Sequence, residues 1–426
     1  MITSTERAED LLFSILLQLA VMIGAARVMN LVFRRFGQPG VIGETVAGLM
    51  LGPSLFGHFF PGLSASLFGA QPAPAIVILS QIGLVLLMFQ IGMNFEFGRL
   101  REARARRALL PVAAASIAVP FGLGLGLGHL SAPLFAGHIR VAVYALFCGV
   151  ALAITAVPVL GRILAEFGMT KEELGVLAIS AAAINDVVGW AMLAVVSAIA
   201  TATFTPLGMA LQLAGLLGFA LVCALILRPA AGRLLEAFPV QGGEMPPTLM
   251  AVLLIAVFFL GMCTSKLGIF TIFGGFAAGL LVHHDRAFVE AWRRQIGSFV
   301  LVFFLPIFFT FTGLRTNLLG LSGMTDWSWL AIFTVTATLG KTIPVFIAAR
   351  SVGYGGAAAG ILGALLNARG LMELIVLNIG LETGFIPPKI FTMLVIMAVA
   401  TTLATGPLLK FLMPRAGLTI PRGIDA

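Results

Sequence analysis

The chain has 426 residues, of which 59% are hydrophobic and only 10% are charged. A soluble domain is about a quarter charged, so this composition excludes a soluble protein and indicates one that lies almost wholly within a membrane. The formal net charge of +8 does not indicate nucleic-acid binding, because no basic domain is present to bind phosphates, whereas basic residues in short loops orient membrane spans.

Apolar runs of about the length of a membrane span recur from one end of the sequence to the other. A bilayer core about 30 Å thick needs about 20 apolar residues per helix. We therefore predict an all-α integral membrane protein with about thirteen transmembrane helices, of which the second and ninth are short and rich in glycine. The predicted spans are 11–33, 41–55, 75–94, 108–128, 139–165, 173–200, 207–228, 247–265, 268–283, 296–314, 327–349, 356–380 and 387–412.

Basic residues gather in alternate loops between these spans. The stretches "FRRFG", "GRLREARARR" and "HHDRAFVEAWRR" follow the first, third and ninth spans, whereas "GHFFPGLSASLFGAQPAP" and "HLSAPLFAGH" are almost uncharged. Because positive loops stay inside, we expect the N-terminus outside, the C-terminus in the cytoplasm and an odd number of spans. We also expect only a short cytoplasmic tail after the last span, with no appended regulatory domain.

Two predicted spans are interrupted by residues that disfavour a helix. The fifth reads "GVALAITAVPVLGRIL", with Pro158 in mid-helix and the polar Thr155 before it, and proline removes a backbone donor and clashes with the preceding turn. The twelfth reads "GILGALLNARGLMELIVLNIG", where Asn367, Arg369 and Gly370 interrupt an apolar helix. Each is the middle span of a triplet, and an odd spacing gives the triplets opposite orientations. Such matching interruptions indicate the binding site of a transporter, although a simple kink at Pro158 and a satisfied polar Asn367 are the plainer alternative.

Few charged residues lie deep within the spans, where each costs at least about 2.5–3.5 kcal/mol on insertion scales. Asp186 lies near the middle of the sixth span, Lys341 near the middle of the eleventh, and Arg369 at the interruption of the twelfth. Glu373 follows Arg369 by four residues, a spacing that allows pairing along one helix face. That pair could be structural, Lys341 could neutralise a helix C-terminus or extend towards the interface, and Glu44 is interpreted as structural.

Asp186 is the charge with the strongest case for a function. Positions 182, 183, 189 and 190, one helical turn away on either side, carry no charge. A structural explanation would be a pair with Lys341. The functional explanation is a carboxylate that faces a cavity and binds a proton or a small cation in competition, with backbone carbonyls of a broken helix and the Thr155 hydroxyl as further oxygen ligands. No nucleophile–base arrangement and no metal-ligand cluster is evident at membrane depth, so we expect neither an enzyme nor a cofactor.

The sequence resembles the monovalent cation:proton antiporter superfamily in its second branch. The stretches that carry the resemblance are "QPGVIGETVAGLMLGPSLFG", "LFCGVALAITAVPVLGRILAEFGM", "SAAAINDVVGWAML", "GKTIPVF" and "LLNARGLMELIVLNIG". The last three are similar to the plant cation/proton exchanger type and its bacterial relatives. The resemblance covers nearly the whole chain, and the ordered set of motifs is more specific than any one of them.

The resemblance implies a homodimer in a bacterial inner membrane, in which a mobile core domain moves relative to a dimerisation scaffold. The core would consist of two inverted repeats with crossed discontinuous helices, the sodium/proton antiporter fold. The implied division is 1–106 for the first part of the scaffold, 107–201 for the first core repeat, 202–230 for a linker helix, 231–318 for the second part of the scaffold, 319–414 for the second core repeat and 415–426 for the tail.

Carried over residue by residue, the resemblance implies that Asp186 binds the ion or proton, preceded by Asn185, and that Thr155 lies at the crossover. In members with two aspartates, a basic residue matching Lys341 pairs with the first aspartate, but here Asn185 stands at that position. An Asn-Asp pair goes with electroneutral exchange in the superfamily. Lys341 is therefore left without its usual partner.

One further departure concerns the second broken helix. Some Asn-Asp members carry a glutamate five residues before the aspartate, paired with the arginine of the broken helix. That position is Ala181 here, so Glu373 is the expected partner of Arg369.

We therefore predict a secondary active antiporter that exchanges K⁺ or Na⁺ for H⁺ at Asp186, by alternating access and without net charge movement. The alternative is a sodium-coupled importer of an organic anion, which would need more polar residues around the crossing helices. Besides Asn367, those that stand out are Thr401, Thr402 and Thr405. A passive ion channel, which would lack proton coupling, is a second alternative.

Overall fold

The computed structural model describes residues 4–69, 74–93, 103–200, 206–267 and 271–419. This part of the chain is helical and contains no strand, apart from one isolated bridge between Gln241 and Glu244. Several predicted features lie wholly or partly outside the described residues: the basic loop up to residue 102, the boundary at 201–202, the start of the span predicted at 268–283, and the tail from residue 420 onward.

Contacts between residues divide the chain into two compact units. The first unit comprises Met1–Ile23, Ser66–Phe97 and Thr201–Phe311, and the second comprises Gly24–Ala65, Gly98–Ala200 and Thr312–Ala426. Three helices run along the chain from one unit into the other: α1 (Ser4–Arg35), α4 (Pro61–Phe68) and α15 (Leu305–Leu314). Residues 24–65, which the predicted division placed with the scaffold, are grouped by their contacts with the second unit. The division into a scaffold and a moving core remains a prediction.

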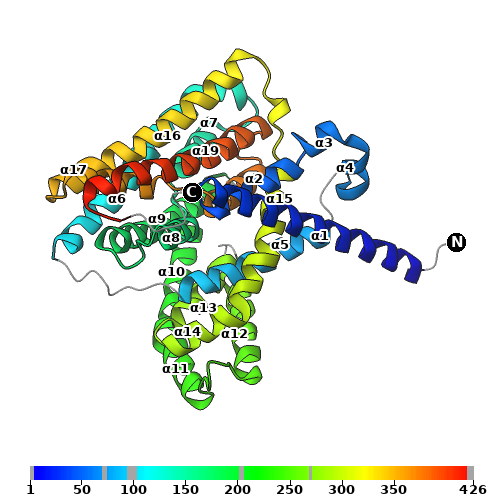
Figure 1. Cartoon of the computed structure of the whole chain (residues 1–426), viewed down its shortest axis with the longest axis vertical. Helices are drawn as coiled ribbons and strands as arrows, with labels where there is room; N and C mark the ends of the chain where they lie inside the picture. Colours follow the sequence, from blue (N-terminus) through cyan, green and yellow to red (C-terminus); the bar gives the residue numbers. More distant parts are fainter. Residues whose placement is uncertain (1–3, 70–73, 94–102, 201–205, 268–270, 420–426) are drawn as a thin grey trace. The chain divides into compact units, whose positions relative to one another are not determined.

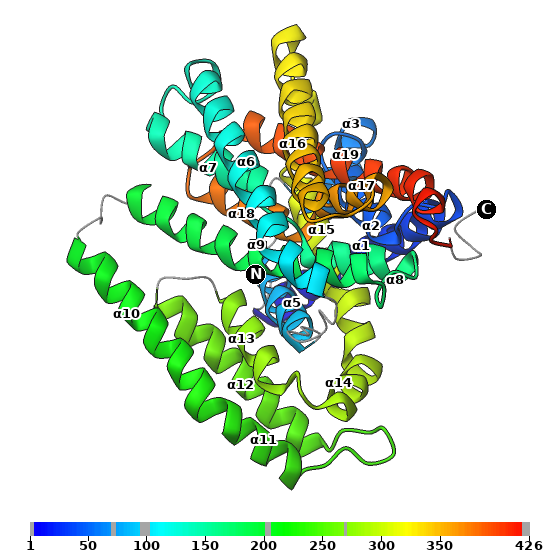
Figure 2. The same ribbon diagram turned by 90° about the vertical axis from the view of Figure 1, so that its left-hand side faces the viewer.

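The first unit is built around a pair of apolar helices, α5 and α13, which pack against each other and against α12. Its elements are α5 (Pro74–Met93), α10 (Pro206–Val222), the π-helical turn η1 (Cys223–Leu227), α11 (Arg228–Ala237), α12 (Pro247–Lys266), α13 (Ile272–Val282), α14 (Arg286–Trp292) and the π-helical turns η2 (Arg293–Gly297) and η3 (Val300–Phe304). Through η1, the helices α10 and α11 continue as one long rod (Figure 2).

The second unit contains two sets of helices, α6 to α9 and α16 to α19, each with a discontinuous helix in its middle. Its elements are α2 (Gly40–Leu51), α3 (Phe56–Phe59), α6 (Ala103–Phe135), α7 (Val141–Ala153), α8 (Val157–Glu166), α9 (Glu173–Ala200), the 3₁₀ turn η4 (Leu318–Gly320), α16 (Gly323–Ser351), α17 (Gly356–Leu366), α18 (Leu371–Glu382), α19 (Pro388–Leu412) and η5 (Pro414–Ala416). The long helices α6 and α16 pack against each other, and α6 also packs against α7 and α9 while α16 packs against α17 and α19 (Figure 1). These packings make the two sets one body.

The predicted count of thirteen spans is not confirmed. Within the described ranges, eleven helices are long and apolar enough to cross a membrane, and two further apolar helices, Val141–Ala153 and Ile272–Val282, are shorter. The two short helices occupy the places of the fifth and ninth predicted spans. A helix rises about 1.5 Å per residue, so neither short helix alone spans a bilayer core of about 30 Å. α7 ends at Ala153, where the helix is interrupted, and α13 begins at Ile272.

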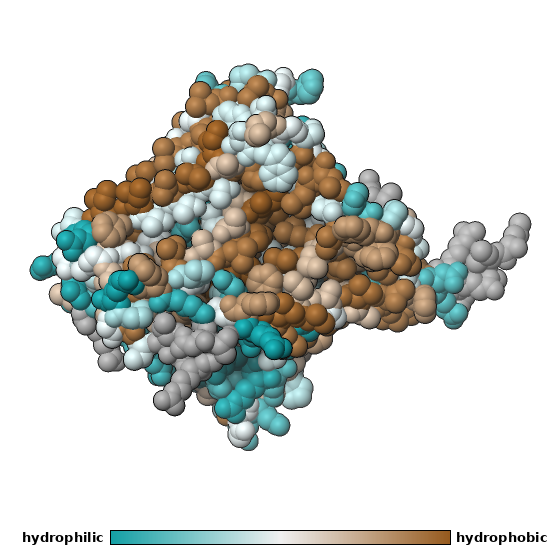
Figure 3. All heavy atoms as spheres, turned by 45° about the horizontal axis from the view of Figure 1, so that its top comes forward, coloured by the Kyte–Doolittle hydropathy of each residue, from teal (hydrophilic) through white to brown (hydrophobic). Residues whose placement is uncertain are grey.

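Large hydrophobic side chains are exposed on helices of both units, and broad hydrophobic areas are visible in Figure 3. Among the most exposed are Phe13, Leu31, Leu225, Ile255 and Phe259. Soluble proteins rarely expose contiguous apolar patches of more than a few hundred Å². This surface suits the hydrocarbon core of a bilayer, and the chain is a multi-pass membrane protein.

Candidate functional site

The lone carboxylate in the middle of α9 is the centre of the candidate site. Asp186 is partly exposed, and its Oδ1 atom is buried without a hydrogen-bond partner among the described residues. No ion pair joins it to Lys341 in that part of the chain, although the two charges interact electrostatically. The structural explanation considered for Asp186, a direct pair with Lys341, is therefore not what the geometry shows. One carboxylate oxygen stays free to accept a proton or a cation.

Asn185, the residue before Asp186, links α9 to two other elements by hydrogen bonds. The Asn185 side chain is 1% exposed, and its Nδ2 donates to Ser116 Oγ of α6 at 2.9 Å and to Thr155 Oγ1 at 3.0 Å. The Ser116 hydroxyl in turn lies 3.2 Å from Asn185 Oδ1. Because both ends of the amide are held, the orientation of this turn of α9 is fixed, and with it the position of Asp186. Ser116 was not predicted as part of the site.

The first break lies between α7 and α8. Residues 154–156 leave the helical conformation, with Ile154 at ψ 141° and Ala156 at φ −92° and ψ 96°. Pro158 lies in the first turn of α8, where a missing N–H is tolerated because that N–H would have no partner within the helix. Gly189 of α9 packs beside this break, since a Cβ at that position would lie 2.9 Å from Ile154 Cγ1.

The second break lies between α17 and α18. Asn367 follows the last residue of α17, and Gly370 precedes α18 with φ 149° and ψ −119°, a conformation open essentially to glycine alone. A Cβ at Gly370 would also lie 2.8 Å from Val159 Cγ2 of α8. Both the backbone angle and the contact therefore require glycine here.

The two breaks meet, and we call the joined segments Ile154–Ala156 and Asn367–Gly370 the crossing. The Ala156 N–H donates to Ala368 O at 3.3 Å, and the Thr155 hydroxyl donates to Leu366 O at 3.2 Å. Thr155 thus accepts from the α9 asparagine while it donates to the end of α17. Non-helical backbone at membrane depth is stable only when its polar groups find such partners.

Two buried cations close the C-terminal end of α7. Arg369 donates from Nη1 to Ala151 O at 2.9 Å and from Nη2 to Leu152 O at 2.7 Å. Lys341 Nζ donates to Ala153 O at 2.5 Å and to Ile154 O at 2.9 Å. The last carbonyls of a helix have no partner within it and carry partial negative charge, so the two cations satisfy them in hydrogen bonding and in charge. Lys341, left without a partner by the sequence, has one here: the backbone of the first broken helix.

Arg369 also contacts Glu373, at 3.4 Å between Nη1 and Oε1, and both side chains are fully buried. Its backbone N–H donates to Thr402 Oγ1 of α19 at 2.8 Å, which holds the second break against that helix. The shorter contacts of the guanidinium go to the α7 carbonyls, so the carboxylate is a secondary partner.

Several buried polar atoms of the crossing, and of α9 and α18 beside it, have no hydrogen-bond partner in the described part of the chain. They are both amide atoms of Asn367, Arg369 Nε, Glu373 Oε2 and Asp186 Oδ1. An unsatisfied buried polar group costs about 1–3 kcal/mol, and buried water commonly satisfies such groups. The crossing therefore has a polar interior within an otherwise apolar unit.

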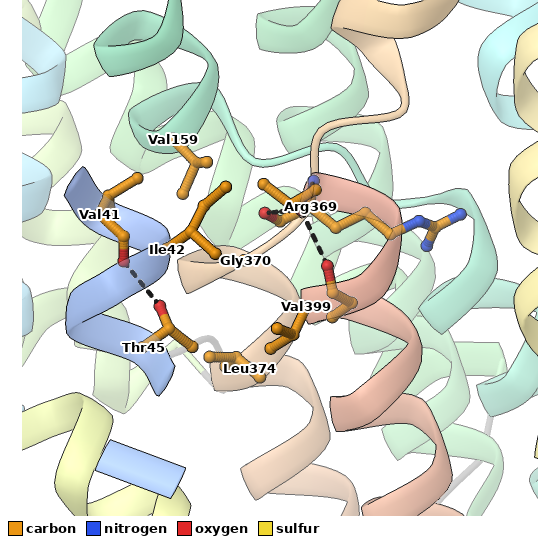
Figure 4. A pocket seen from close by; sticks show the side chains of 10 residues that line it. Val41, Ile42, Thr45, Val159, Arg369, Gly370, Leu374 and Val399 are labelled. Carbon is orange, nitrogen blue, oxygen red and sulfur yellow. Dashed lines mark hydrogen bonds between the residues drawn. The ribbon is translucent and has the colours of Figure 1, made fainter. Parts of the chain in front are cut away.

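A small pocket adjoins the crossing, with about 270 Å³ of empty space. Figure 4 shows it between α2, α8 and the second broken helix, with Val41, Ile42 and Thr45 on one side and Val159 beside them. The Arg369 side chain points away from the pocket (Figure 4), towards the α7 carbonyls. The pocket is lined mainly by apolar side chains, so it is not itself a cation site.

The arrangement bears on one expectation about the ligands. The carbonyl oxygens of residues 151–154 each accept a hydrogen bond from the cationic Arg369 or Lys341, and these positive charges disfavour a transported cation beside them. Asp186 supplies a negative oxygen, and the Thr155 hydroxyl oxygen retains an acceptor lone pair. Among the described residues, no group of three or more His, Cys, Asp or Glu side chains could hold a metal ion.

The sequence and the fold both match known proteins. The family model described as "Sodium/hydrogen exchanger, transmembrane" matches residues 19–414. The Na(+)/H(+) antiporter NhaS4 of Synechocystis sp. is 38% identical over 95% of this chain and 98% of its own length. Cation/H(+) antiporter 18 of Arabidopsis thaliana is 34% identical over 92% of this chain, and K(+)/H(+) antiporter 1 of Saccharomyces cerevisiae is 29% identical over 94%.

This chain spans about half the length of the plant and yeast relatives, 48% and 46% respectively. Among solved structures, the sodium proton antiporter MjNhaP1 from Methanocaldococcus jannaschii covers 94% of this chain and 99% of its own, with a TM-score of 0.61 and 15% sequence identity. At that identity the likeness concerns the fold alone, and it confirms the predicted sodium/proton antiporter fold.

Proposed function

This chain belongs to the sodium/hydrogen exchanger family, and from that premise we propose that it is a secondary active antiporter that exchanges Na⁺ or K⁺ for H⁺. The relatives named above are cation/proton antiporters, one for Na⁺ and one for K⁺ by name. Nothing in them supports an importer of organic anions. The polar interior of the crossing, held within a membrane-embedded unit, supports the same function from the structure.

The observation that carries the site is the unpartnered carboxylate of Asp186. Its Oδ1 is buried and accepts no hydrogen bond among the described residues, a state that costs free energy and that either a proton or a cation relieves. A single carboxylate cannot hold both at once, so binding of one releases the other. This competition is the coupling step of an exchanger.

The neighbouring residues orient this carboxylate. Asn185 holds α9 through Ser116 and Thr155, and the Thr155 oxygen is the candidate second ligand for a cation. Lys341 and Arg369 neutralise the end of α7. The Lys341 and Arg369 side chains stay bound to backbone carbonyl oxygens. Neither has to change its partner when Asp186 exchanges a proton for a metal cation. We therefore propose that only Asp186 changes charge in the cycle, which makes exchange of one monovalent cation for one proton electroneutral.

The assembly is proposed on the same premise. The chain would work as a homodimer in the bacterial inner membrane, with its N-terminus outside and its C-terminus in the cytoplasm. The second unit contains both broken helices and would be the part that moves to expose Asp186 to each side alternately.

The test of the site is the variant Asp186→Asn in proteoliposomes with a trapped pH dye. Without an ionisable group at this position, Na⁺- or K⁺-driven proton movement should fall to the level of protein-free liposomes, while the elution volume of the detergent-solubilised protein stays unchanged. The matched control is Asp285→Asn, since Asp285 caps α14 by accepting from Phe288 N at 2.9 Å and asparagine caps a helix about as well. Full exchange by Asp186→Asn would overturn the assignment.

The test of charge balance is the exchange rate at a clamped membrane potential. An electroneutral cycle proceeds at one rate whether the potential is zero or about 100 mV of either sign, whereas one net charge per cycle would add about 2.3 kcal/mol of driving force. The Asn185→Asp variant sharpens the test, because a second carboxylate beside Asp186 should make the rate depend on the potential.

A further inference from the structure

Away from Asp186, a group of four charged side chains in the second unit joins α8 to α1 and α2; we call it the α2–α8 clamp. It consists of Glu44 of α2, Arg162 and Glu166 of α8, and Arg34 of α1. The partners lie far apart in sequence, since Arg162 follows Glu44 by 118 positions. The carboxylates and the guanidiniums alternate, so the group is neutral as a whole.

Glu44 is the buried member of the clamp. Its side chain is 4% exposed and accepts from Arg162 Nη1 at 3.2 Å and Nη2 at 3.4 Å. A third donor, Asn30 Nδ2 of α1, lies 2.6 Å from Glu44 Oε1. Three donors on one carboxylate, two of them from one guanidinium fork, form a specific contact. A charge that merely snorkelled to the surface would not have these partners.

Glu166 extends the clamp by one turn of α8. It lies 3.5 Å from Arg34 Nη2 and 3.4 Å from Gly40 N, the first residue of α2. Since residues 162 and 166 are four apart, they lie on the same face of the helix. The C-terminal half of this face of α8 is therefore linked to α1 and α2 by ion pairs and one backbone hydrogen bond.

The same two helices meet again at the pocket beside the crossing. Ile42 of α2 and Val159 of α8 are both buried and line that pocket together with Gly370 (Figure 4). Gly370 packs directly on Val159. The clamp and these apolar pocket-lining side chains thus flank one side of the crossing, and α8 carries residues of both.

The chemistry of the clamp suits a contact that opens and closes. Buried ion pairs contribute little net stability, because the cost of removing two charges from water nearly cancels their attraction. When α8 and α2 separate, water enters and solvates both charges, so the closed and open states differ little in free energy. An apolar contact of the same size would lose its full burial energy on opening.

We propose that Glu44 and Arg162 are gating residues: the pair closes the route from the Glu166 end of α8 to the crossing and breaks once in each transport cycle. The inference rests on the proposed exchange at Asp186 and adds to it the place where access is controlled. By the predicted orientation, this end of α8 faces the cytoplasm. The closed clamp is then the state in which Asp186 is shut off from that side.

A covalent link across the pocket separates a gate from a structural brace. Ile42→Cys and Val159→Cys are introduced into a chain whose Cys148, Cys223 and Cys263 are replaced by alanine, and the pair is joined with bifunctional thiol reagents of graded length. With the shortest spacer we expect cation/proton exchange to fall at least about tenfold in the fully linked protein, and to return on reduction. Each single-cysteine variant, treated with the same reagent, is the matched control and should keep its rate.

Two outcomes would overturn the proposal. Exchange at the full rate in quantitatively linked protein would show that α2 and α8 move together and that the clamp is a brace. Failure of every reagent to link the pair would contradict the adjacency on which the inference rests. An absence of exchange in the unlinked protein, and in the native chain, would be a failure of the proposed function instead and is recognised separately.

Charge exchange between the partners tests the pair itself. Glu44→Gln and Arg162→Gln should each lower the maximal exchange rate about tenfold. The cation concentration for half-maximal rate should stay within about twofold of the native value, because neither residue contacts Asp186. The double variant Glu44→Arg with Arg162→Glu restores the pair, and Asn30 can turn its amide oxygen towards the new guanidinium. Its rate should return to within about threefold of the native protein, and a double variant no better than the single ones would contradict the pairing.

Discussion

The two repeats of the second unit are joined by two polar clusters in opposite environments. At the crossing, the fully buried cations Lys341 and Arg369 bind carbonyl oxygens at the end of α7. At the end of the unit where α6 and α9 begin, Arg104 lies 3.1 Å from Glu173 and its guanidinium stacks 4.4 Å from the centre of the Tyr354 ring. There the Tyr354 hydroxyl donates to Glu173 Oε1 at 2.5 Å, and the Arg104 side chain is 47% exposed.

The difference lies in what each cation is paired with. The outer cluster, formed by Arg104, Glu173 and Tyr354, pairs charge with charge and is close to neutral. Water can reach the side chains of Arg104 and Glu173, which are 47% and 23% exposed, if either loses its partner. The crossing pairs charge with backbone dipoles, so its cations do not neutralise Asp186 by a direct contact, and no water replaces a lost partner. Burial therefore makes the crossing sensitive to every substitution, whereas the outer cluster should tolerate them.

The largest effect is expected for Lys341→Met, which removes both hydrogen bonds to residues 153 and 154 and leaves two buried carbonyls unpaired. At about 1–3 kcal/mol for each unsatisfied group, the free energy of unfolding should fall by several kcal/mol, and exchange should be lost. Thermal unfolding of the detergent-solubilised protein measures the first and proteoliposome flux the second. If Lys341→Met had the same free energy of unfolding as the native protein, the crossing would be no more sensitive to substitution than the outer cluster.

A smaller loss is expected for Arg369→Lys. The ammonium retains the charge but lacks the planar fork, so one of the contacts to Ala151 and Leu152 is lost, at about 1–3 kcal/mol. Exchange should slow and not vanish, because charge compensation of α7 is preserved. A variant indistinguishable from the native protein in unfolding temperature would show that the bidentate geometry is unimportant.

At the outer cluster, Arg104→Gln should change the free energy of unfolding by no more than about 0.2–1 kcal/mol, as is typical of exposed ion pairs. The small difference should shrink further in about 1 M salt, where charges are screened within about 3 Å. The exchange rate should stay unchanged. If Arg104→Gln lowered the free energy of unfolding as much as Lys341→Met, solvent exposure would not explain the difference between the two clusters.

The smallest effect concerns Tyr354→Phe and depends on pH. Burial, followed by the hydrogen bond and charge of Glu173, raises the pKa of the Tyr354 phenol, and Arg104 opposes this only in part. The folded protein thus holds the phenol proton more tightly than the unfolded chain, in which it ionises near pH 10 or so. This contribution is complete below that pH and is lost as the pH rises through the folded-state value. Unfolding temperatures of the two proteins should differ by a constant amount from about pH 7 to 9 and converge above about pH 10.

The sequence was most informative where a residue costs free energy at its predicted depth in the membrane. Asp186 stood out because a charge in mid-span is expensive, and the second break stood out because polar residues and glycine coincided. Proline alone would have misled: Pro111 and Pro120 of α6 and Pro344 of α16 lie inside continuous helices, whereas Pro158 lies in the first turn of α8. The backbone groups at a helix break need hydrogen-bond partners from elsewhere in the fold, and no sequence pattern indicates which residues supply them.

The contacts that organise the site were correspondingly harder to predict. Ser116 is one small hydroxyl in an apolar span, indistinguishable in sequence from a serine that bonds only its own helix. The partners of Lys341 are carbonyl groups, which every residue has, so only the position of the break reveals them. The buried pairing of Glu44 with Arg162 joins helices 118 residues apart, and the interpretation of Glu44 as structural gave no indication of its partner.

The closing of α7 by two distant cations also has a consequence for how the protein is made. The arginine that binds Ala151 O comes 218 residues later in the chain, an interval of about 10–45 s at about 5–20 residues per second of synthesis. Until Lys341 is made, 188 residues after Ala153, the end of α7 has neither of its cations, and its exposed carbonyls need water or the insertion machinery as temporary partners. The first repeat is therefore completed only when the last third of the chain arrives, and the two halves mature as one assembly and not in succession.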